Sequence, residues 1–91
     1  MTTIPEANLA AAHDLALRLP SMGYLAARVL PDGSVAALLD LIYTRAICLG
    51  CTEHGHAQRF CFEDRRVADQ RFADLQSEDD EPNGFLARRF V

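Results

Sequence analysis

The stretch 58–75 changes from an alternating apolar pattern to a helical one, and this change constrains the fold more than any other feature. Phe60 and Phe62 stand two residues apart, as on one side of an extended strand. Beyond Asp64, apolar residues recur at the spacing of one helical face: Val67, Ala68, Phe72 and Leu75. We therefore expect a strand that leads directly into a helix capped by Asp64, with their apolar faces packed together as the core.

A second helix is expected near the N-terminus. Thr3 and Glu6 stand at the spacing of a capping box, and Pro5 suits a first helical turn, where its missing N–H is not needed. Leucines and alanines then recur on one helical face until Pro20, which cannot continue the hydrogen-bond ladder. We predict a helix over 4–19.

Between the two helical patterns, the sequence is typical of antiparallel strands. The turn Pro31-Asp32-Gly33 separates two apolar runs, which predicts a hairpin with strands over 24–30 and 34–43. The second run also fits a helical stripe, but the turn and the Val, Ile, Tyr and Thr content favour a strand. Two further strands are expected over 45–52 and 57–62.

Together these patterns predict an α+β fold with an N-terminal helix, a four-stranded antiparallel meander, and a C-terminal helix packed on one face of the sheet. In this layout Asp40 shares a strand face with Leu38, so it must face solvent or pair with an arginine. The expected organisation is a single domain over 1–91, with a helix at 4–19, antiparallel strands within 24–62, a helix at 64–76, and an acidic loop and closing segment at 77–91.

Charge and cysteine content narrow the classes of function. The chain of 91 residues has 13 acidic and 9 basic residues, all of them arginine, and a net charge of −4. This balance argues against direct binding to nucleic-acid phosphates and permits binding to a basic partner. No export signal or apolar run of about 20 residues is visible. We therefore expect a cytoplasmic protein without a membrane segment. The odd number of cysteines in a chain without an export signal predicts reduced thiols.

A run of acidic residues follows the second helix and is the leading candidate for a binding site. Its members are Asp74, Glu78, Asp79, Asp80 and Glu81. Carboxylates clustered in this way can imitate the phosphates of nucleic acid and compete for an arginine-lined groove on a partner. The alternative is a loop that is acidic only because it is solvated.

The cysteines and histidines between the third and fourth strands are a candidate metal site. Cys48, Cys51, His54 and His56 are residue types that bind zinc, at compact spacing. Against this, Cys48 and Cys51 are three residues apart and should face opposite sides of a strand. A second Cys-x-x-Cys pair is also missing. We therefore favour buried structural thiols without a cofactor and keep a zinc site as the alternative.

Arginines next to phenylalanines suggest a platform for single-stranded nucleic acid, where bases stack on aromatic rings above a basic groove. The arginines concerned are Arg59, Arg65, Arg66, Arg71, Arg88 and Arg89, and the aromatic residues are Phe60, Phe62 and Phe90. Alternation places Arg59 on the strand face opposite Phe60 and Phe62, which favours core aromatics instead. No phosphate-binding glycine loop, carboxylate pair or activated nucleophile is recognisable, so we do not expect an enzyme.

The order of these features resembles small proteins of phages and prophages in GC-rich proteobacteria. The resemblance covers residues 24–89 and rests on the segments Pro31-Asp32-Gly33, Arg59-Phe60-Cys61-Phe62-Glu63, Glu81-Pro82-Asn83-Gly84-Phe85 and Arg88-Arg89. The chain departs from the pattern by having phenylalanine where tryptophan or tyrosine is expected, and by its N-terminal helix.

Small acidic phage proteins include anti-CRISPR and other anti-defence inhibitors. The resemblance therefore implies a protein-interaction module that binds and blocks a surface of a host protein or ribonucleoprotein complex, such as a CRISPR-Cas complex. An open sheet also has unpaired edges, which allows a homodimer. The alternative function is a small nucleic-acid-associated or zinc-stabilised regulator.

Overall fold

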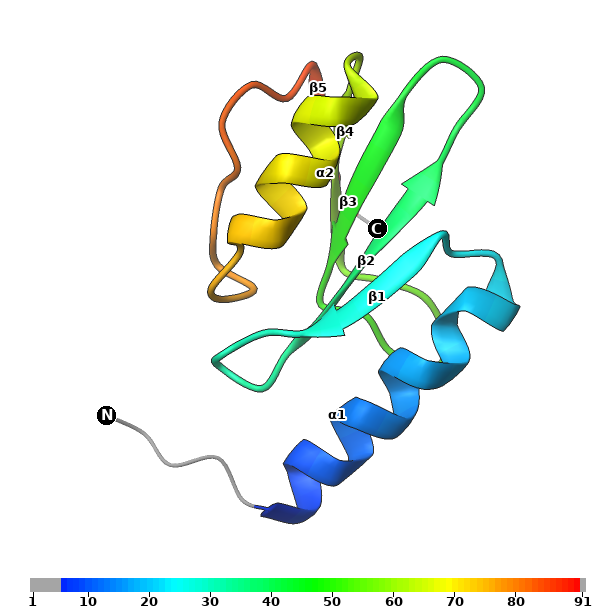
Figure 1. Ribbon diagram of the computed structural model, residues 1–91, viewed down its shortest axis with the longest axis vertical. Helices are drawn as coiled ribbons and strands as arrows, with labels where there is room; N and C mark the ends of the chain where they lie inside the picture. Colours follow the sequence, from blue (N-terminus) through cyan, green and yellow to red (C-terminus); the bar gives the residue numbers. More distant parts are fainter. Residues whose placement is uncertain (1–5, 91) are drawn as a thin grey trace.

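The computed structural model describes residues 6–90 and, among these, the side chains of residues 9–89 (Figure 1). The elements in chain order are helix α1 (Glu6–Arg18), the 3-10 turn η1 (Leu19–Met22), strands β1 (Ala26–Val29), β2 (Val35–Asp40), β3 (Arg45–Leu49) and β4 (Gln58–Phe62), helix α2 (Arg65–Asp74) and strand β5 (Ala87–Phe90). The strands form one antiparallel sheet in the order β1-β2-β3-β4-β5. The α+β class predicted from the sequence is confirmed.

The two helices lie on opposite faces of the sheet and make three layers (Figure 1). Helix α1 contacts β1 and β2, whereas α2 contacts β2, β3 and β4. Each face has its own apolar cluster. The buried residues on the α2 face are Leu30, Ala36, Leu38, Ile47, Leu49, Phe60, Phe62, Ala68, Phe72 and Leu75. Those on the α1 face are Ala12, Leu19, Val35, Ala37, Ala46, Cys48, Cys51 and Cys61.

The strand-to-helix unit forms as predicted. Phe60 and Phe62 are buried under α2, and the helix returns Phe72 and the following Leu75 to the same cluster. Asp64 Oδ1 accepts a hydrogen bond from Arg66 N at 2.9 Å, which satisfies one of the free donors at the start of α2. This unit connects strand β4 to the helix that covers one face of the sheet.

The predicted number of four strands is wrong, because the closing segment forms a fifth. Strand β5 pairs with β4, placing Arg88 opposite Phe60 and Arg89 opposite Arg59. An edge strand that carries an arginine on each face shows no apolar alternation, so period-2 analysis does not detect it. The two arginines also discourage pairing of this edge with another chain.

The predicted boundaries of the other elements are close to the observed ones. The 34–43 segment is a strand rather than a helix, but it ends at Asp40, so Ile42 and Tyr43 form the turn to β3. Asp40 pairs with an arginine as expected, with Arg45 Nε 2.8 Å from Asp40 Oδ1. The start of the first helix at residue 4 and its capping box lie outside the described residues.

Gly50 ends the alternation of β3. Its φ of +66° lies in the left-handed region, and a Cβ placed there would lie 2.8 Å from the Cβ of Ala57. The turn at Gly50 brings Cys51 back onto the face that Cys48 occupies. A side chain at Gly50 would therefore disturb the chain that leads into the 51–57 loop.

We predict that Gly50→Ala lowers the free energy of unfolding by about 2 kcal/mol, the sum of left-handed strain and the close contact with Ala57. Urea denaturation measures the loss. Adding Ala57→Gly removes the contacted methyl, so a double-mutant cycle should show a favourable coupling between the two sites. Additive losses would contradict the contact.

Candidate functional site

The acidic loop between α2 and β5 is stabilised by one of its own carboxylates. Asp80 Oδ2 accepts hydrogen bonds from the backbone N–H groups of Gln76 at 2.7 Å and Ser77 at 3.3 Å. Asp80 Oδ1 lies 3.4 Å from the Ser77 hydroxyl. The Asp80 carboxylate therefore organises the turn and does not project toward a partner.

Two contacts fix this loop to distant parts of the sheet. Glu78 N donates to Asp32 Oδ2 at 3.0 Å, and Gln58 Nε2 donates to the Glu78 carbonyl at 3.3 Å. Asp32 belongs to the β1–β2 turn and also accepts from Ser34 N at 3.0 Å. Partial burial raises the pKa of Asp32, but hydrogen bonds from Ser34 and from Glu78 N outweigh it, so that the pKa is lowered. Asp32 thus adds an ionised carboxylate beside the loop.

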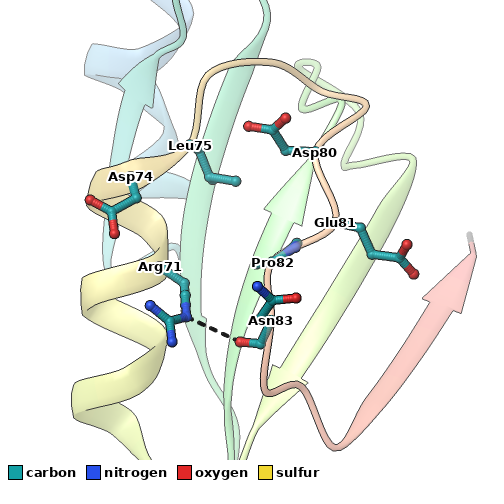
Figure 2. A pocket seen from close by; sticks show the side chains of 7 residues that line it. All are labelled: Arg71, Asp74, Leu75, Asp80, Glu81, Pro82 and Asn83. Atoms are coloured by element: carbon teal, nitrogen blue, oxygen red, sulfur yellow. Dashed lines mark hydrogen bonds between the residues drawn. The ribbon is translucent and has the colours of Figure 1, made fainter.

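A cleft of about 250 Å³ separates the C-terminal end of α2 from the loop (Figure 2). Its lining residues are Arg71, Asp74, Leu75, Asp80, Glu81, Pro82 and Asn83. The acids do not converge in it: the Asp74 side chain points away from the loop, and that of Glu81 points away from α2. Arg71 Nε donates to the Asn83 carbonyl at 3.2 Å and spans the cleft.

The five predicted acidic residues therefore fall into two groups. Asp80 caps the turn, and Glu81 forms an ion pair with Arg88 at 3.2 Å. The side chains of Asp74, Glu78 and Asp79 are exposed and have no ion pair or hydrogen bond with any residue that the structure describes. Three acidic side chains thus face solvent from a loop and helix end whose backbone is held in place.

The sequence analysis did not identify Arg28, the residue that fixes the C-terminal end of α2. Arg28 of β1 donates from Nη1 to the carbonyl oxygens of Phe72, Ala73 and Leu75 at 2.6, 3.1 and 3.2 Å. A cation is favourable at the carbonyl end of a helix, where the last carbonyl groups lack the N–H of a following turn; Phe72 O also accepts from Leu75 N at 3.4 Å. Arg28 therefore anchors the end of α2 that leads into the acidic loop. No local sequence pattern predicts this contact between β1 and α2.

The expectation that Cys48 and Cys51 face opposite sides is wrong. Both are buried in the cluster on the α1 face, because Gly50 interrupts the strand between them. Burial is the main cause that raises the pKa of each thiol to about 12, so both are neutral at physiological pH. Cys51 Sγ lies 3.6 Å from the Cys48 carbonyl oxygen. These contacts are those of structural thiols rather than reactive ones.

The two histidines are not placed to complete a metal site. The side chain of His54 is 87% exposed and lies 3.5 Å from Glu53, whereas His56 Nδ1 lies 2.9 Å from the hydroxyl oxygen of Tyr24. Burial, followed by the charge of Arg59, lowers the pKa of His56. Within the described residues, no group of three or more histidine, cysteine or acidic side chains is arranged to hold a metal ion.

The arginines do not form one basic groove with the phenylalanines. Phe60 and Phe62 are buried on the α2 face and Arg59 lies on the other, as expected from alternation. Three of the other candidate arginines have partners within the protein: Arg65 with Asp40, Arg71 with Asn83, and Arg88 with Glu81. Phe90 lies outside the residues whose side chains are described.

The β2–β3 turn carries an apolar pair that the sequence analysis assigned to a strand. Ile42 is 85% exposed and Tyr43 84% exposed. At the base of this turn, Arg45 forms ion pairs with Asp40 at 2.8 Å and with Asp69 of α2 at 2.7 Å. These contacts fix the turn relative to the helix. Exposed aromatic and aliphatic side chains on a braced turn are suited to contact with another protein.

The fold and this site define a small α+β protein with an anchored acidic loop. No family model matches the chain, and neither a curated protein nor a solved structure matches it at a significant level. Neither helix in the described part of the chain has the length and apolar character needed to cross a membrane.

Proposed function

We propose that this chain is a protein-interaction module that binds a basic surface of a partner through its acidic loop. The observation that carries the proposal is the anchoring of the loop while the carboxylates of Asp74, Glu78 and Asp79 stay unpaired among the described residues. A loop that is already ordered loses little conformational entropy on binding, so its charges contribute more to affinity.

The resemblance to small phage proteins directs the choice of partner. Anti-defence proteins of this kind block host complexes that bind nucleic acid, and such complexes present arginine-lined and lysine-lined grooves. A row of carboxylates occupies a groove of that kind by charge complementarity. We therefore propose that the partner is a host defence ribonucleoprotein of the CRISPR-Cas type, and that the chain competes with its nucleic-acid substrate.

The test is inhibition of a purified CRISPR-Cas effector by the full chain. The variant Asp74→Asn/Glu78→Gln/Asp79→Asn removes the three unpaired charges and leaves Asp80 and Glu81 to hold the loop. We predict that it inhibits target-DNA binding at least about tenfold more weakly than the unaltered chain, with the difference shrinking as salt increases.

A matched control carries Asp14→Asn, Glu53→Gln and Glu63→Gln, which remove the same number of charges at exposed positions elsewhere. This control should inhibit as strongly as the unaltered chain. Equal loss in both variants would assign the effect to net charge and contradict a role for the loop. A chain that inhibits no defence effector would remove the proposed partner.

A further inference from the structure

Two buried side-chain nitrogen atoms, His56 Nε2 and Arg59 Nε, have no hydrogen-bond partner, and they are the only buried side-chain polar atoms in this condition in the described residues. Arg59 Nε carries a hydrogen atom and can only donate a hydrogen bond. Tyr24 lies 2.9 Å from His56 Nδ1, so when its hydroxyl donates, the neutral imidazole carries its proton on Nε2. Both nitrogens are then donors that lack an acceptor.

The two donors belong to the same part of the α1 face. The strand registers place Ala37, Cys48, Arg59 and Arg89 in one row across β2, β3, β4 and β5. Ala37 and Cys48 are buried on the α1 face, so Arg59 and Arg89 extend from that face too. Tyr24 packs against the cluster on the α1 face and its hydroxyl lies 2.9 Å from His56 Nδ1, so His56 lies on this face as well, three residues before Arg59.

Arg59 and Arg89 are directly opposite each other on neighbouring strands, an arrangement that repulsion between like charges makes unfavourable. Neither has an ion pair or hydrogen bond with the residues that the structure describes. Six of the other arginines interact with an acid or a carbonyl: Arg18, Arg28, Arg45, Arg65, Arg71 and Arg88. Three residues therefore meet here, two unpaired arginines and His56, and two of the three carry a buried nitrogen without a partner, an arrangement that favours a negatively charged acceptor.

We propose that this part of the α1 face binds a small oxyanion between Arg59, Arg89 and His56. A carboxylate or phosphate has several oxygen acceptors in a geometry that suits the planar guanidinium fork, and its charge offsets both arginines. It would accept from Arg59 Nε and His56 Nε2, the two atoms left without partners. His56 also lines a surface hollow of about 520 Å³ that Tyr24 and the 50–57 loop form beside this part of the face.

This site lies on the sheet face opposite α2 and does not depend on the function proposed for the acidic loop. NMR titration of the isotope-labelled full chain tests it, with sodium phosphate and sodium acetate as probes and sodium chloride at equal ionic strength as the reference. We expect the His56 ring and Arg59 Nε–H signals to move saturably with an oxyanion but not with chloride. A stronger response to phosphate assigns a tetrahedral anion, and a stronger response to acetate assigns a carboxylate.

Arg59→Gln and Arg89→Gln should each weaken the oxyanion affinity about tenfold, because each removes a charged donor. Arg66→Gln, at an exposed position on α2, should leave the affinity unchanged. Phosphate or acetate should also raise the melting temperature of the unaltered chain more than that of Arg59→Gln. Signals that respond to oxyanions no more than to chloride would overturn the proposal and leave an enclosed water molecule as the acceptor.

Discussion

Replacing Phe60 with alanine lowers the free energy of unfolding by about 3–5 kcal/mol, because it removes a large side chain from the centre of the core. Phe60 is fully buried on the α2 face. Its ring lies 5.0 Å from that of Phe85, edge to face, and the Arg88 guanidinium lies 5.0 Å from its centroid. The substitution therefore leaves a cavity and also removes contacts with the segment that leads into β5.

Urea denaturation of Phe60→Ala measures this loss. A domain of this size has a total stability of about 5–15 kcal/mol, so the variant can be largely unfolded. Phe60→Leu then provides a smaller, measurable loss at the same position. Tyr43→Ala is the control, because Tyr43 is 84% exposed and should change the stability by less than about 0.5 kcal/mol. A similar loss in both alanine variants would contradict the assignment of Phe60 to the core.

Alkaline pH destabilises the fold through the buried thiols. The pKa of Cys48 and Cys51 is raised mainly by burial from 9.0 to about 12. Above pH 9 the unfolded chain loses these protons while the native chain keeps them, so the unfolded state binds fewer protons and the free energy of unfolding falls. The shift corresponds to at most roughly 4 kcal/mol for one thiol, and access of solvent to the sulfur reduces this figure.

Urea denaturation between pH 8 and pH 11 measures this dependence. The variant Cys48→Ala/Cys51→Ala should lose less stability over that range than the unaltered chain, although two small apolar contacts are lost at every pH. Tyr24→Phe separates the contribution of Tyr24, whose pKa is also raised, first by burial and then by Cys51 and Cys48. Identical slopes for the unaltered chain and the cysteine variant would contradict the assignment.

Local patterns predicted the parts of the fold that depend on neighbouring residues. The Phe60 to Leu75 strand-to-helix unit, the turn at Asp32 and the cap at Asp64 were all recognisable, because alternation, helical spacing and turn chemistry act over a few residues. Alternation also predicted that Asp40 would face solvent or pair with an arginine, and it forms an ion pair with Arg45. These features need no knowledge of the distant chain.

Contacts between distant segments were not predictable in the same way. Arg28 caps a helix more than 40 residues away in the sequence, and Asp32 holds Glu78 across a similar separation. The juxtaposition of Arg59 and Arg89 depends on the register of a strand that was not recognised. For the predicted acidic site, the sequence identifies the acidic residues. Only the tertiary contacts distinguish Asp80 and Glu81, which have partners, from the unpaired Asp74, Glu78 and Asp79.

The order of the strands has a consequence for how the chain reaches its native state. The pairings β1–β2, β2–β3 and β3–β4 each join consecutive strands across a short connection, so they cost little chain entropy. Only β5 joins its neighbour across an intervening helix and the acidic loop. The pairing of β5 with β4 therefore closes the longest connection in the sheet and costs the most chain entropy of the four strand pairings.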